Sequence, residues 1–564
     1  MDTGQINLLW GRAVVAQLVA SGVRHAVISP GSRSTPLVLA LAENETMEAI
    51  PVLDERSAGF LALGLSKATG VPVALVCTSG SAVANLLPAV VEARMAGVPI
   101  LILTADRPPE LQDCHAGQTI DQQEIFGRHA RMFAQAGVPS EEGLPVMRKL
   151  LAEAFQKSLS ADGPVHLNFP FREPLLPEGE TILSHGQEEK QGNEAPFVMS
   201  NPEPEKTPDM ECPFHRVLVI AGAGGPGLVN GWGMEVLGFA RKQGWPVLAD
   251  PLSGLRDRAG EGGDLVIAHY DSILRDNIIA NSLKPEAVLQ VGTLPTSKVL
   301  RQRLQEWDVP GWVVSPLGEN FDPLHSSREP LEFLPVAGGP TADADEGYAR
   351  GWMEADTAAS THFQKVLDDC DDWFEGKVAW MLNRHLPEGT AIHVASSMPI
   401  RDVESFWGRN NLKRKLSANR GANGIDGTLS TALGIAQAHG RACLLTGDLA
   451  FLHDRNGLLL AGNPQFSGRL TVLLVNNNGG GIFEGLAIAG MNPPFEEFFA
   501  TPQHIDFQKL SEAHGIPHHR PVDWDDFAEL ISRVEEVPVR VIEVCTDRKK
   551  DSALRREILK LSKT

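Results

Sequence analysis

The chain has 564 residues, enough for about three domains of ordinary size. Hydrophobic residues make up 43% and charged residues 21%, which is typical of a globular protein with a substantial core. The formal net charge is −21. It argues against a nucleic-acid-binding surface, which needs a basic face, and it means that an anionic ligand must be held by local arginines.

The six cysteines are scattered, with no Cys-x-x-Cys pair, and indicate free thiols in a reducing compartment. The first residues enter a helical pattern without a basic and then apolar leader, and no run of 18 apolar residues occurs. We therefore expect a cytoplasmic protein with no membrane insertion and no nucleic-acid partner.

Residues 1–180 alternate short apolar strands with helical patterns. Strands are expected at Arg24–Ser29, Val71–Cys77 and Val98–Thr104, and one long apolar helix at Ser81–Met95. Short strands that alternate with helices predict a parallel, doubly wound α/β sheet.

Residues 181–213 are polar, aperiodic and rich in Glu and Pro, which predicts a linker. A second α/β unit, 214–335, is followed by a shorter linker-like stretch, 336–350. A third unit, 351–564, has expected strands at Ala391–Ala395, Ala442–Thr446, Leu470–Val475 and Arg540–Cys545. The first and third units share one plan, in which ligand-type residues follow the strands, so ligands are expected at the carboxyl edge of each sheet.

The second unit carries a pattern typical of dinucleotide-binding sites. After the strand Val217–Ile220, the glycines of Gly222–Gly227 form G-x-G-x-x-G, and Asp250 follows at a suitable distance. By itself the pattern predicts an NAD or FAD site and, as one alternative function, a nucleotide-binding regulatory protein without catalysis. Pro226 favours a structural turn instead, because it cannot donate an N–H group from the first turn of the helix.

Hard oxygen ligands follow two strands of the third unit. Gly447 and Asp448 end one strand, and Asn477 and Gly479 follow the next, about 30 residues later, which is the length of one strand–helix–strand crossover. A carboxylate, an amide oxygen and a Gly carbonyl suit Mg²⁺, which takes phosphate oxygens at its remaining positions. The pattern predicts a site for a divalent metal and a diphosphate, and a strand-end turn with an Asn-rich hairpin is the structural alternative.

This Gly-Asp, spacer, Asn-Asn pattern resembles the signature of thiamine diphosphate enzymes. The resemblance implies three doubly wound domains, of which the first binds pyrimidine, the second is a Rossmann-like middle domain, and the third binds diphosphate and metal. It also implies that Asp448, Asn477 and the carbonyl of Gly479 bind Mg²⁺ or Mn²⁺, with Gly447 and Leu449 beside the cofactor. Leu449 is a departure, because the family usually has Gly after the Asp.

The resemblance implies further cofactor contacts. Thiamine chemistry needs one carboxylic acid that shares a proton with the pyrimidine ring, and Glu55 matches that residue. The structural alternative is a charge cluster, Asp54-Glu55-Arg56, at the start of a helix. Additional contacts are expected at Thr78, Gly80, Ser397 and Ile425, where Ile425 would lie under the thiazolium ring but could equally be a core residue.

Four arginines stand at predicted strand ends or turns beside Gly, Pro or Ser, namely Arg33, Arg107, Arg401 and Arg420. Their forked donors suit carboxylates, although each alone could be solvated or ion-paired. The strings ISPGSRSTPL, LTADRPPEL, NRGANGIDG, GDLAFLHDRNGL and VNNNGGGIF resemble one branch of the family, the 2-succinyl-5-enolpyruvyl-6-hydroxy-3-cyclohexene-1-carboxylate (SEPHCHC) synthases, where Leu after the Asp is normal.

That branch implies a transferase of menaquinone or phylloquinone biosynthesis that decarboxylates 2-oxoglutarate and adds the resulting four-carbon carbanion to isochorismate. Besides Glu55, the catalytic residues expected are Arg33, Gln118, Arg401 and Arg420. The substrates are expected on Ser32, Arg33, Arg107, Gln118, Lys298, Arg401 and Arg420. Ile482, Phe483 and Leu486 are expected as an apolar wall beside cofactor and substrate.

Two further expectations follow from this resemblance. Gly117 replaces the usual Asn before Gln118, so one substrate hydrogen bond is lost or left to the backbone. The Glu and the metal motif that serve one cofactor come from different subunits in this superfamily, which implies a homodimer or homotetramer. A competing interpretation is another carboligase, such as an acetohydroxyacid synthase, which uses pyruvate and often FAD; the four arginines argue against it.

Overall fold

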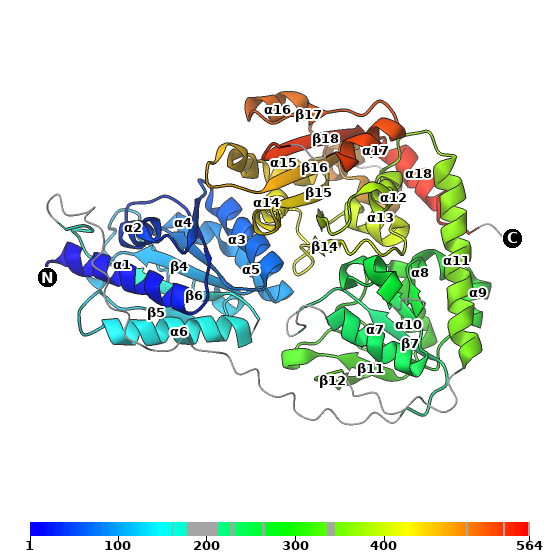
Figure 1. Cartoon of the computed structure of the whole chain (residues 1–564), viewed down its shortest axis with the longest axis horizontal. Helices are drawn as coiled ribbons and strands as arrows, with labels where there is room; N and C mark the ends of the chain where they lie inside the picture. The colour runs from blue at the N-terminus through cyan, green and yellow to red at the C-terminus, as the bar shows by residue number, and fades with distance from the viewer. Residues whose placement is uncertain are drawn as a thin grey trace. The chain divides into compact units, whose positions relative to one another are not determined.

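The computed structural model describes residues 1–160, 162–177, 212–225, 228, 232–261, 265–334, 345–491, 494–533 and 536–561. The chain forms two compact units. The first comprises Met1–Glu203, Leu433–Ala438 and Asn456–Ser467, and the second comprises Pro204–Ala432, His439–Arg455 and Gly468–Thr564. One six-stranded sheet lies in the first unit and two lie in the second (Figure 1). All their strand pairs are parallel, which confirms the predicted doubly wound α/β class.

The sheet of the first unit has the strand order β2-β1-β3-β4-β6-β5. Its strands are β1 (His25–Ile28), β2 (Glu48–Pro51), β3 (Val73–Cys77), β4 (Ile100–Asp106), β5 (Phe133–Gln135) and β6 (Val165–Pro170). Its helices are α1 (Thr3–Ala20), α2 (Thr35–Glu43), α3 (Glu55–Thr69), α4 (Ser81–Asn85), α5 (Leu87–Ala96) and α6 (Leu144–Ser160). Buried residues of α1, α2 and α6 share one core with alternate strand residues such as Ala74 and Val76, whereas Leu75 lies against α3 on the opposite face.

The long helix predicted at 81–95 is two helices. The first, α4, ends at Asn85, and α5 begins at Leu87 with Pro88 in its first turn. Proline has no N–H to donate, and its ring would clash with the carbonyl of Ala84 in a continuous helix. The prediction of one helix was therefore wrong at this residue.

The middle sheet has the order β12-β11-β10-β7-β8-β9. Its strands are β7 (Val217–Ala221), β8 (Val247–Ala249), β9 (Val266–Ile267), β10 (Ala287–Val291), β11 (Gly311–Val314) and β12 (Glu329–Leu331). Its helices are α7 (Trp232–Gln243), α8 (Tyr270–Ile273), α9 (Asn277–Ser282) and α10 (Lys298–Trp307). Read from the other edge, the order is the 3-2-1-4-5-6 of Rossmann folds.

The described residues of the glycine-rich motif in the middle sheet make close packing contacts with the neighbouring backbone. A Cβ on Gly222 would overlap the carbonyl oxygen of Thr293, and the Thr293 N–H donates to the carbonyl of Ala223 at 2.9 Å. Asp250 is buried and accepts the backbone N–H of Leu252 at 2.7 Å. These contacts favour a structural turn over a nucleotide site. Pro226 and Gly227 lie outside the described residues.

The third sheet has the order β14-β13-β15-β16-β18-β17, which is the same topology as the first. Its strands are β13 (Ala391–Val394), β14 (Lys415–Ala418), β15 (Arg441–Gly447), β16 (Arg469–Asn476), β17 (His518–His519) and β18 (Val539–Cys545). Its helices are α12 (Glu375–His385), α13 (Met398–Phe406), α14 (Thr428–His439), α15 (Asp448–His453), α16 (Phe507–Ala513), α17 (Trp524–Ser532) and α18 (Arg548–Ile558). The shared strand order explains the common sequence plan of the first and third units.

The predicted linkers lie largely outside the described residues. This holds for 181–211 and for 336–344, whereas residues 346–350 form the first turn of α11 (Glu346–Asp368). The domain boundaries drawn from the sequence stay predictions. Within the second unit, α11 runs past both sheets (Figure 1), with Trp352 in the core of the middle sheet and Phe363 in the core of the third.

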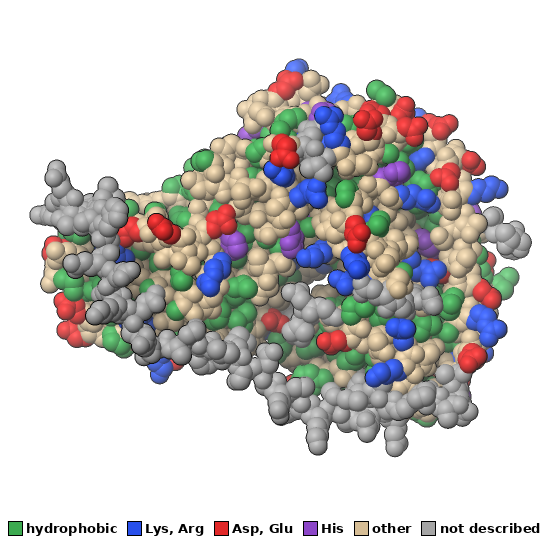
Figure 2. All heavy atoms as spheres, in the orientation of Figure 1, with side chains coloured by type: hydrophobic (Ala, Val, Ile, Leu, Met, Phe, Trp, Pro, Cys, Tyr) green, Lys and Arg blue, Asp and Glu red, His purple; other side chains and the backbone are tan. Residues whose placement is uncertain are grey.

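Charged side chains of both signs are interspersed over the face shown in Figure 2. This distribution agrees with the acidic composition, and the face shows no continuous basic surface. All six cysteines are free. Among the described residues, no helix combines the length and the apolar character needed to cross a membrane.

A buried ion pair joins the middle and third sheets inside the second unit. Arg414 Nε donates to Asp257 Oδ1 at 2.8 Å, and both side chains are almost fully buried. Arg414 also donates to the carbonyls of Leu382 and Asn383, and Trp407 Nε1 donates to Asp257 Oδ2 at 2.7 Å. Each polar group of the pair is therefore satisfied in the fold.

Replacing Arg414 by Ala should lower the free energy of unfolding by about 3–5 kcal/mol, because it leaves the Asp257 carboxylate buried without its cation. The measurement is urea unfolding followed by tryptophan fluorescence. The control is Arg12→Ala, which breaks the exposed pair with Glu43 and should change stability by no more than about 1 kcal/mol. Equal losses in the two variants would contradict this account of the buried pair.

Candidate active site

The predicted ligand residues lie at equivalent places in the first and third sheets. In the order 2-1-3-4-6-5, the chain reverses direction across the sheet between the first and third strands, and ligands of open α/β sheets bind outside the carboxyl ends at that point. In the first sheet this is the end of β1 and β3, which are followed by Ser32, Arg33, Thr78 and Gly80. In the third sheet it is the end of β13 and β15, which are followed by Ser397, Gly447 and Asp448.

Asp448 ties two neighbouring strand ends together. Strands β15 and β16 are adjacent and parallel, with Gly447 opposite Val475. The buried carboxylate of Asp448 accepts the N–H groups of Leu449 and Gly479, each at 2.8 Å. Burial raises the pKa of Asp448 to about 6. The predicted proximity of Asp448 to the Asn-rich loop is thus realised in the structure.

The amide oxygen of Asn477 is a second candidate metal ligand. Its side chain is 7% exposed, and its Nδ2 donates to Glu375 Oε2 at 3.3 Å. Its Oδ1 is buried and has no hydrogen-bond partner among the described residues. A buried acceptor left unpaired costs free energy, which a metal ion in contact with this oxygen would remove.

Gly479 determines the backbone conformation of the loop that carries Asn477, and its carbonyl is the third candidate metal ligand. Its φ is +131°, and a Cβ there would overlap the carbonyl oxygen of Ala500, so this position needs glycine. One carboxylate, one free amide oxygen and one carbonyl form a hard-oxygen set that fits Mg²⁺ or Mn²⁺. No group of three or more His, Cys, Asp or Glu side chains that could hold a metal occurs in the described part of the chain, so the smaller set of Asp448, Asn477 and Gly479 is the candidate.

The other cofactor residues of the third sheet lie on loops around this edge. Ser397 precedes α13 and has a φ of +74°, and Ile425 is half-buried in the loop before α14 and is no core residue. Ile482 and Phe483 lie in the 3-10 helix η9 (Gly481–Gly485) directly after Gly479, and both are half-buried. Leu486, at the end of this helix, is 39% exposed.

In the first unit, one polar cluster brings together several predicted substrate residues. An Arg107 guanidinium nitrogen donates to the hydroxyl of Ser79 and, at 3.0 Å, to the carbonyl of Gln118. Gln118 Nε2 donates to the Ser79 carbonyl at 2.9 Å. Gly80 has a φ of +83°, and a Cβ there would lie 2.8 Å from Gln118 Cγ, so its glycine permits this close packing. A Cβ on Gly31 would likewise overlap the side chain of Thr78.

Arg33 lies beside this cluster and is 5% exposed. Its guanidinium donates to the carbonyl of Phe171 at 2.9 Å and to the exposed carboxylate of Glu173 at 2.8 Å. Burial, and then the positive charge of Arg33, lower the pKa of Arg107. Two guanidinium groups close enough to repel each other favour an anion between them. Ser32 and Gly117 are exposed, and a side chain at Gly117 would meet nothing within 4 Å.

Glu55 is the first residue of α3. Asp54 caps this helix by accepting the N–H groups of Arg56 and Ser57, so the helix-start interpretation describes the local structure correctly. Glu55 is half-buried at a hollow of about 480 Å³, which is lined by Leu53, Asp54, Glu55, Arg56, Asn85, Asn456 and Leu459. Asn85 Nδ2 donates to Glu55 Oε2 at 3.4 Å. The carboxylate is thus available for a ligand.

In the second unit, two of the predicted arginines lie close together. Arg401 donates to the carbonyl of Ser397, and Arg420 donates to the hydroxyls of Ser396 and Thr296 at 3.4 and 3.3 Å. Burial, and then the charge of Arg420, lower the pKa of Arg401. Lys298 begins α10 and is exposed. The oxygens that accept these hydrogen bonds are neutral.

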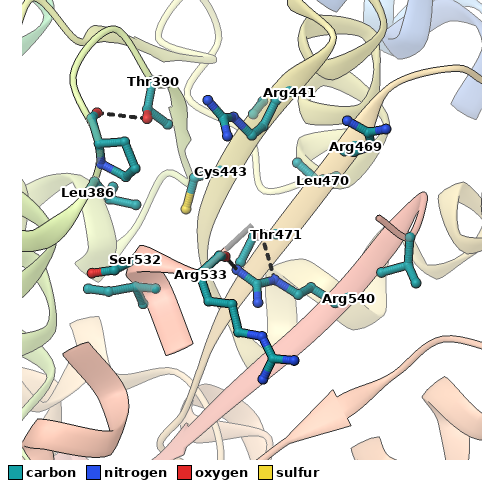
Figure 3. A pocket seen from close by; sticks show the side chains of 14 residues that line it. Leu386, Thr390, Arg441, Cys443, Arg469, Leu470, Thr471, Ser532, Arg533 and Arg540 are labelled. Atoms are coloured by element: carbon teal, nitrogen blue, oxygen red, sulfur yellow. Dashed lines mark hydrogen bonds between the residues drawn. The ribbon is translucent and has the colours of Figure 1, made fainter. Parts of the chain in front are cut away.

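A second group of arginines lines a narrow pocket of about 30 Å³ in the third sheet (Figure 3). Arg441, Arg469 and Arg540 lie near the amino ends of β15, β16 and β18, the edge opposite to the metal ligands. The carboxyl ends of α12 and α17 also reach this pocket, and Arg540 donates to the carbonyls of Leu530 and Arg533. Helix carboxyl ends repel anions and attract cations, so Arg540 stabilises the end of α17.

Sequence reasoning missed the side chains that support the Asn-rich loop. They are Glu375, Glu543 and Arg548, which contact Asn477, Asn476 and the carbonyl of Asn478, respectively. Glu375 precedes the loop by about 100 residues, and Glu543 and Arg548 follow it by about 70. No local pattern in the sequence marks them. Only the folded sheet brings them to the site.

Three family models match the chain. The "Thiamine pyrophosphate enzyme, N-terminal TPP binding domain" matches residues 10–125, the "Middle domain of thiamine pyrophosphate" enzymes matches 204–394, and the "Thiamine pyrophosphate enzyme, C-terminal TPP binding domain" matches 402–544. Together with the three parallel sheets, these matches define the class as that of the thiamine pyrophosphate enzymes.

Curated relatives place the chain within that class. A 2-succinyl-5-enolpyruvyl-6-hydroxy-3-cyclohexene-1-carboxylate synthase of Synechococcus sp. (strain JA-3-3Ab) is 44% identical over 99% of this chain and 96% of its own. Proteins with the same name from Gloeothece citriformis (strain PCC 7424) and Thermosynechococcus vestitus (strain NIES-2133 / IAM M-273 / BP-1) are 45% and 43% identical. They cover 98% and 99% of this chain, and the matches span 97% and 99% of theirs. The chain belongs to this family of synthases.

Replacing Gly479 by Ala should weaken Mg²⁺-dependent binding of thiamine diphosphate about tenfold or more, because the Cβ overlaps the carbonyl of Ala500 and the backbone conformation is strained for alanine. Binding can be followed by quenching of tryptophan fluorescence at several Mg²⁺ concentrations. Gly485→Ala is the control in the same loop, since a Cβ there meets nothing within 4 Å. Unchanged binding in Gly479→Ala would exclude the proposed loop geometry.

Proposed function

We propose that the chain is a transferase that uses thiamine diphosphate and Mg²⁺ or Mn²⁺ to join a four-carbon unit from 2-oxoglutarate to isochorismate. 2-Oxoglutarate loses CO₂, a carbon–carbon bond forms by conjugate (1,4) addition with uptake of one proton, and the enolpyruvyl group is retained in the product SEPHCHC. This reaction is a step of menaquinone or phylloquinone biosynthesis. The observation that carries the proposal is near-full-length similarity to synthases of that name, in a chain whose Gly479 N–H donates to the Asp448 carboxylate.

The metal ligands proposed are the carboxylate of Asp448, the Oδ1 of Asn477 and the carbonyl of Gly479. The buried, unpartnered Oδ1 supports this set. Bound thiamine diphosphate supplies a carbon centre that stabilises negative charge where CO₂ has left. Gly447, Leu449 and Ser397 would lie against its diphosphate side, and Ile425 under its thiazolium ring.

Glu55 is proposed to hold a proton at the pyrimidine ring of the cofactor. Its half-buried place at a hollow of about 480 Å³ supports this role, because a cofactor ring that enters the hollow would meet the carboxylate. Thr78 and Gly80 would line the same end of the cofactor, and Ile482 and Phe483 its apolar side, with Leu486 against the substrate.

The arginines are proposed to bind the substrate carboxylates. Arg33, Arg107 and Gln118, with Ser32, form one group in the first unit, and Arg401, Arg420 and Lys298 form another in the second. In a protein of net charge −21 such local clusters are needed to attract dianions. Arg33, Gln118, Arg401 and Arg420 would also hold the reacting atoms in place.

The active protein is proposed to be a cytoplasmic homodimer or homotetramer. Glu55 and Asp448 belong to separate compact units of one chain. In the proposed assembly, the Glu55 and the Asp448 that serve one cofactor come from different protomers, as the family resemblance implies.

The direct test is an assay of purified protein with thiamine diphosphate, Mg²⁺, 2-oxoglutarate and isochorismate, each omitted in turn. We expect CO₂ release and loss of isochorismate absorbance only with all four present. Turnover of pyruvate with no reaction of 2-oxoglutarate would instead support an acetohydroxyacid synthase. A bound flavin or nicotinamide cofactor and no bound thiamine diphosphate would support the nucleotide-binding alternative.

Replacing Glu55 by Gln should leave thiamine diphosphate affinity within about twofold and lower kcat by roughly 100-fold or more, because the amide keeps the size of the side chain but cannot exchange a proton. Cofactor affinity and steady-state turnover are measured on the same preparation. Glu45→Gln, at an exposed position, is the control and should retain full activity. Full activity of Glu55→Gln would refute the assigned role.

Replacing Arg401 by Ala should raise KM for one carboxylate substrate by roughly 10- to 100-fold, because a charge-assisted hydrogen bond is lost. Arg441→Ala removes an exposed arginine at the opposite edge of the same sheet and should change KM by less than about twofold. Equal changes in both variants would indicate a general electrostatic effect, and Arg401 would then lose its place in the site.

A further inference from the structure

Next to the loop that carries Asn477 and Gly479, carboxylates and a guanidinium are linked by hydrogen bonds in the protein interior. Glu375, the first residue of α12, is 5% exposed. Its Oε1 accepts a hydrogen bond from an Arg555 guanidinium nitrogen at 2.7 Å, and Arg555 Nε donates to Asp402 Oδ1 at 3.0 Å. The other oxygen of Glu375, Oε2, accepts Asn477 Nδ2 at 3.3 Å. Asp402, Arg555, Glu375 and Asn477 are thus linked in series, ending at a proposed metal ligand.

This link decides which end of the Asn477 amide faces the metal position. A carboxamide has a donating NH₂ and an accepting oxygen, whereas an ionised carboxylate only accepts. If the amide were turned by 180°, its oxygen would face the Glu375 carboxylate, and two acceptors would repel each other. Glu375 therefore holds the NH₂ group, which leaves Oδ1 of Asn477 buried and without a hydrogen-bond partner in the described part of the chain.

Arg555 fixes the direction of the Glu375 carboxylate. Its guanidinium lies against Glu375 and Asp402 at 2.7 and 2.8 Å. Because Oε1 of Glu375 is held by Arg555, its other oxygen, Oε2, is the one that faces Asn477.

The neighbouring asparagine is held in the same way by a different glutamate. Asn476 Nδ2 donates to Glu543 Oε1 at 2.7 Å, and the Oδ1 of Asn476 accepts the N–H of Asn478 at 3.2 Å. Glu543 itself is buried and is also contacted by His518 and Arg520. Each of the two asparagines thus gives its NH₂ to a buried carboxylate, but only the oxygen of Asn477 is left without a protein partner.

We propose that Glu375 is a positioning residue of the metal site, which orients the amide of Asn477 so that its oxygen, and not its nitrogen, meets the divalent cation. This inference rests on the metal site of the proposed function and extends it to a side chain that touches neither cofactor nor substrate. Partners behind metal ligands affect metal affinity by about 10- to 100-fold when they are removed.

The test measures the affinity for Mn²⁺ by electron paramagnetic resonance of the free ion, with thiamine diphosphate present and no substrate. In Glu375→Gln the new amide can donate to Oδ1 of Asn477 and turn the ligand, so Mn²⁺ binding should weaken about 10- to 100-fold. The matched control is Glu92→Gln, at an equally buried glutamate that pairs with Lys67 in the first unit. Its Mn²⁺ affinity should change by less than about twofold.

Two further variants separate orientation from a general loss of structure. If Glu375 acts through Asn477, the double variant Glu375→Gln with Asn477→Ala binds Mn²⁺ no more weakly than Asn477→Ala alone. Glu375→Asp keeps the carboxylate and should bind Mn²⁺ more tightly than Glu375→Gln. If the Glu375→Gln protein does not fold, Glu375→Asp is the test variant, and its Mn²⁺ affinity should be lower than that of the wild type.

Three outcomes overturn the inference. They are an unchanged Mn²⁺ affinity in Glu375→Gln, an additive loss in the double variant, and an equal loss in Glu92→Gln. Failure of the proposed metal site is distinguishable from these, because wild-type protein would then bind no Mn²⁺ in the presence of thiamine diphosphate. Failure of the proposed substrates leaves Mn²⁺ binding intact and is detected only by the activity assay.

Discussion

The hydrogen bond from the Gly479 N–H to the Asp448 carboxylate is the contact on which the site depends. It joins the end of β15 to the loop after β16 at 2.8 Å, across the edge where two parallel strands finish. Because parallel strands bring their carboxyl ends to one edge, a carboxylate after one strand meets an asparagine loop after the next. This hydrogen bond positions the loop that carries Asn477, and Glu375 orients the amide of Asn477.

Arginines serve two different purposes in this protein, and the edge of the sheet decides which. At the carboxyl edges, Arg107 and Arg401 donate to hydroxyl or carbonyl oxygens and are proposed to bind anions. At the amino edge of the third sheet, Arg540 donates to carbonyls at the end of α17 and stabilises that helix (Figure 3). Residue type and net charge alone do not distinguish these two uses.

Much of the fold could be predicted from the sequence, because apolar runs that alternate with helical patterns are local signals. The strands that carry the ligand loops were placed within one or two residues of β1, β3, β4, β13, β15, β16 and β18. The break between α4 and α5 was missed although Pro88 stands in the sequence, since the apolar pattern continues across it. The pairing of Arg33 with Glu173 joins residues about 140 positions apart and left no local signal.

The sequence by itself determined the family and the class of sheet and proposed the oxygen ligands, because these are properties of short strings and of residue types at strand ends. Its assignments of substrate and cofactor residues agree with the clusters seen in each unit but stay proposals. Only the tertiary structure decided that Glu375 faces Asn477, that Gly479 needs to be glycine, and that Arg441 lies at the edge opposite to Asp448. The physical reason is that orientation, burial and opposing charge arise from segments about a hundred residues apart, which meet only when the sheet has formed.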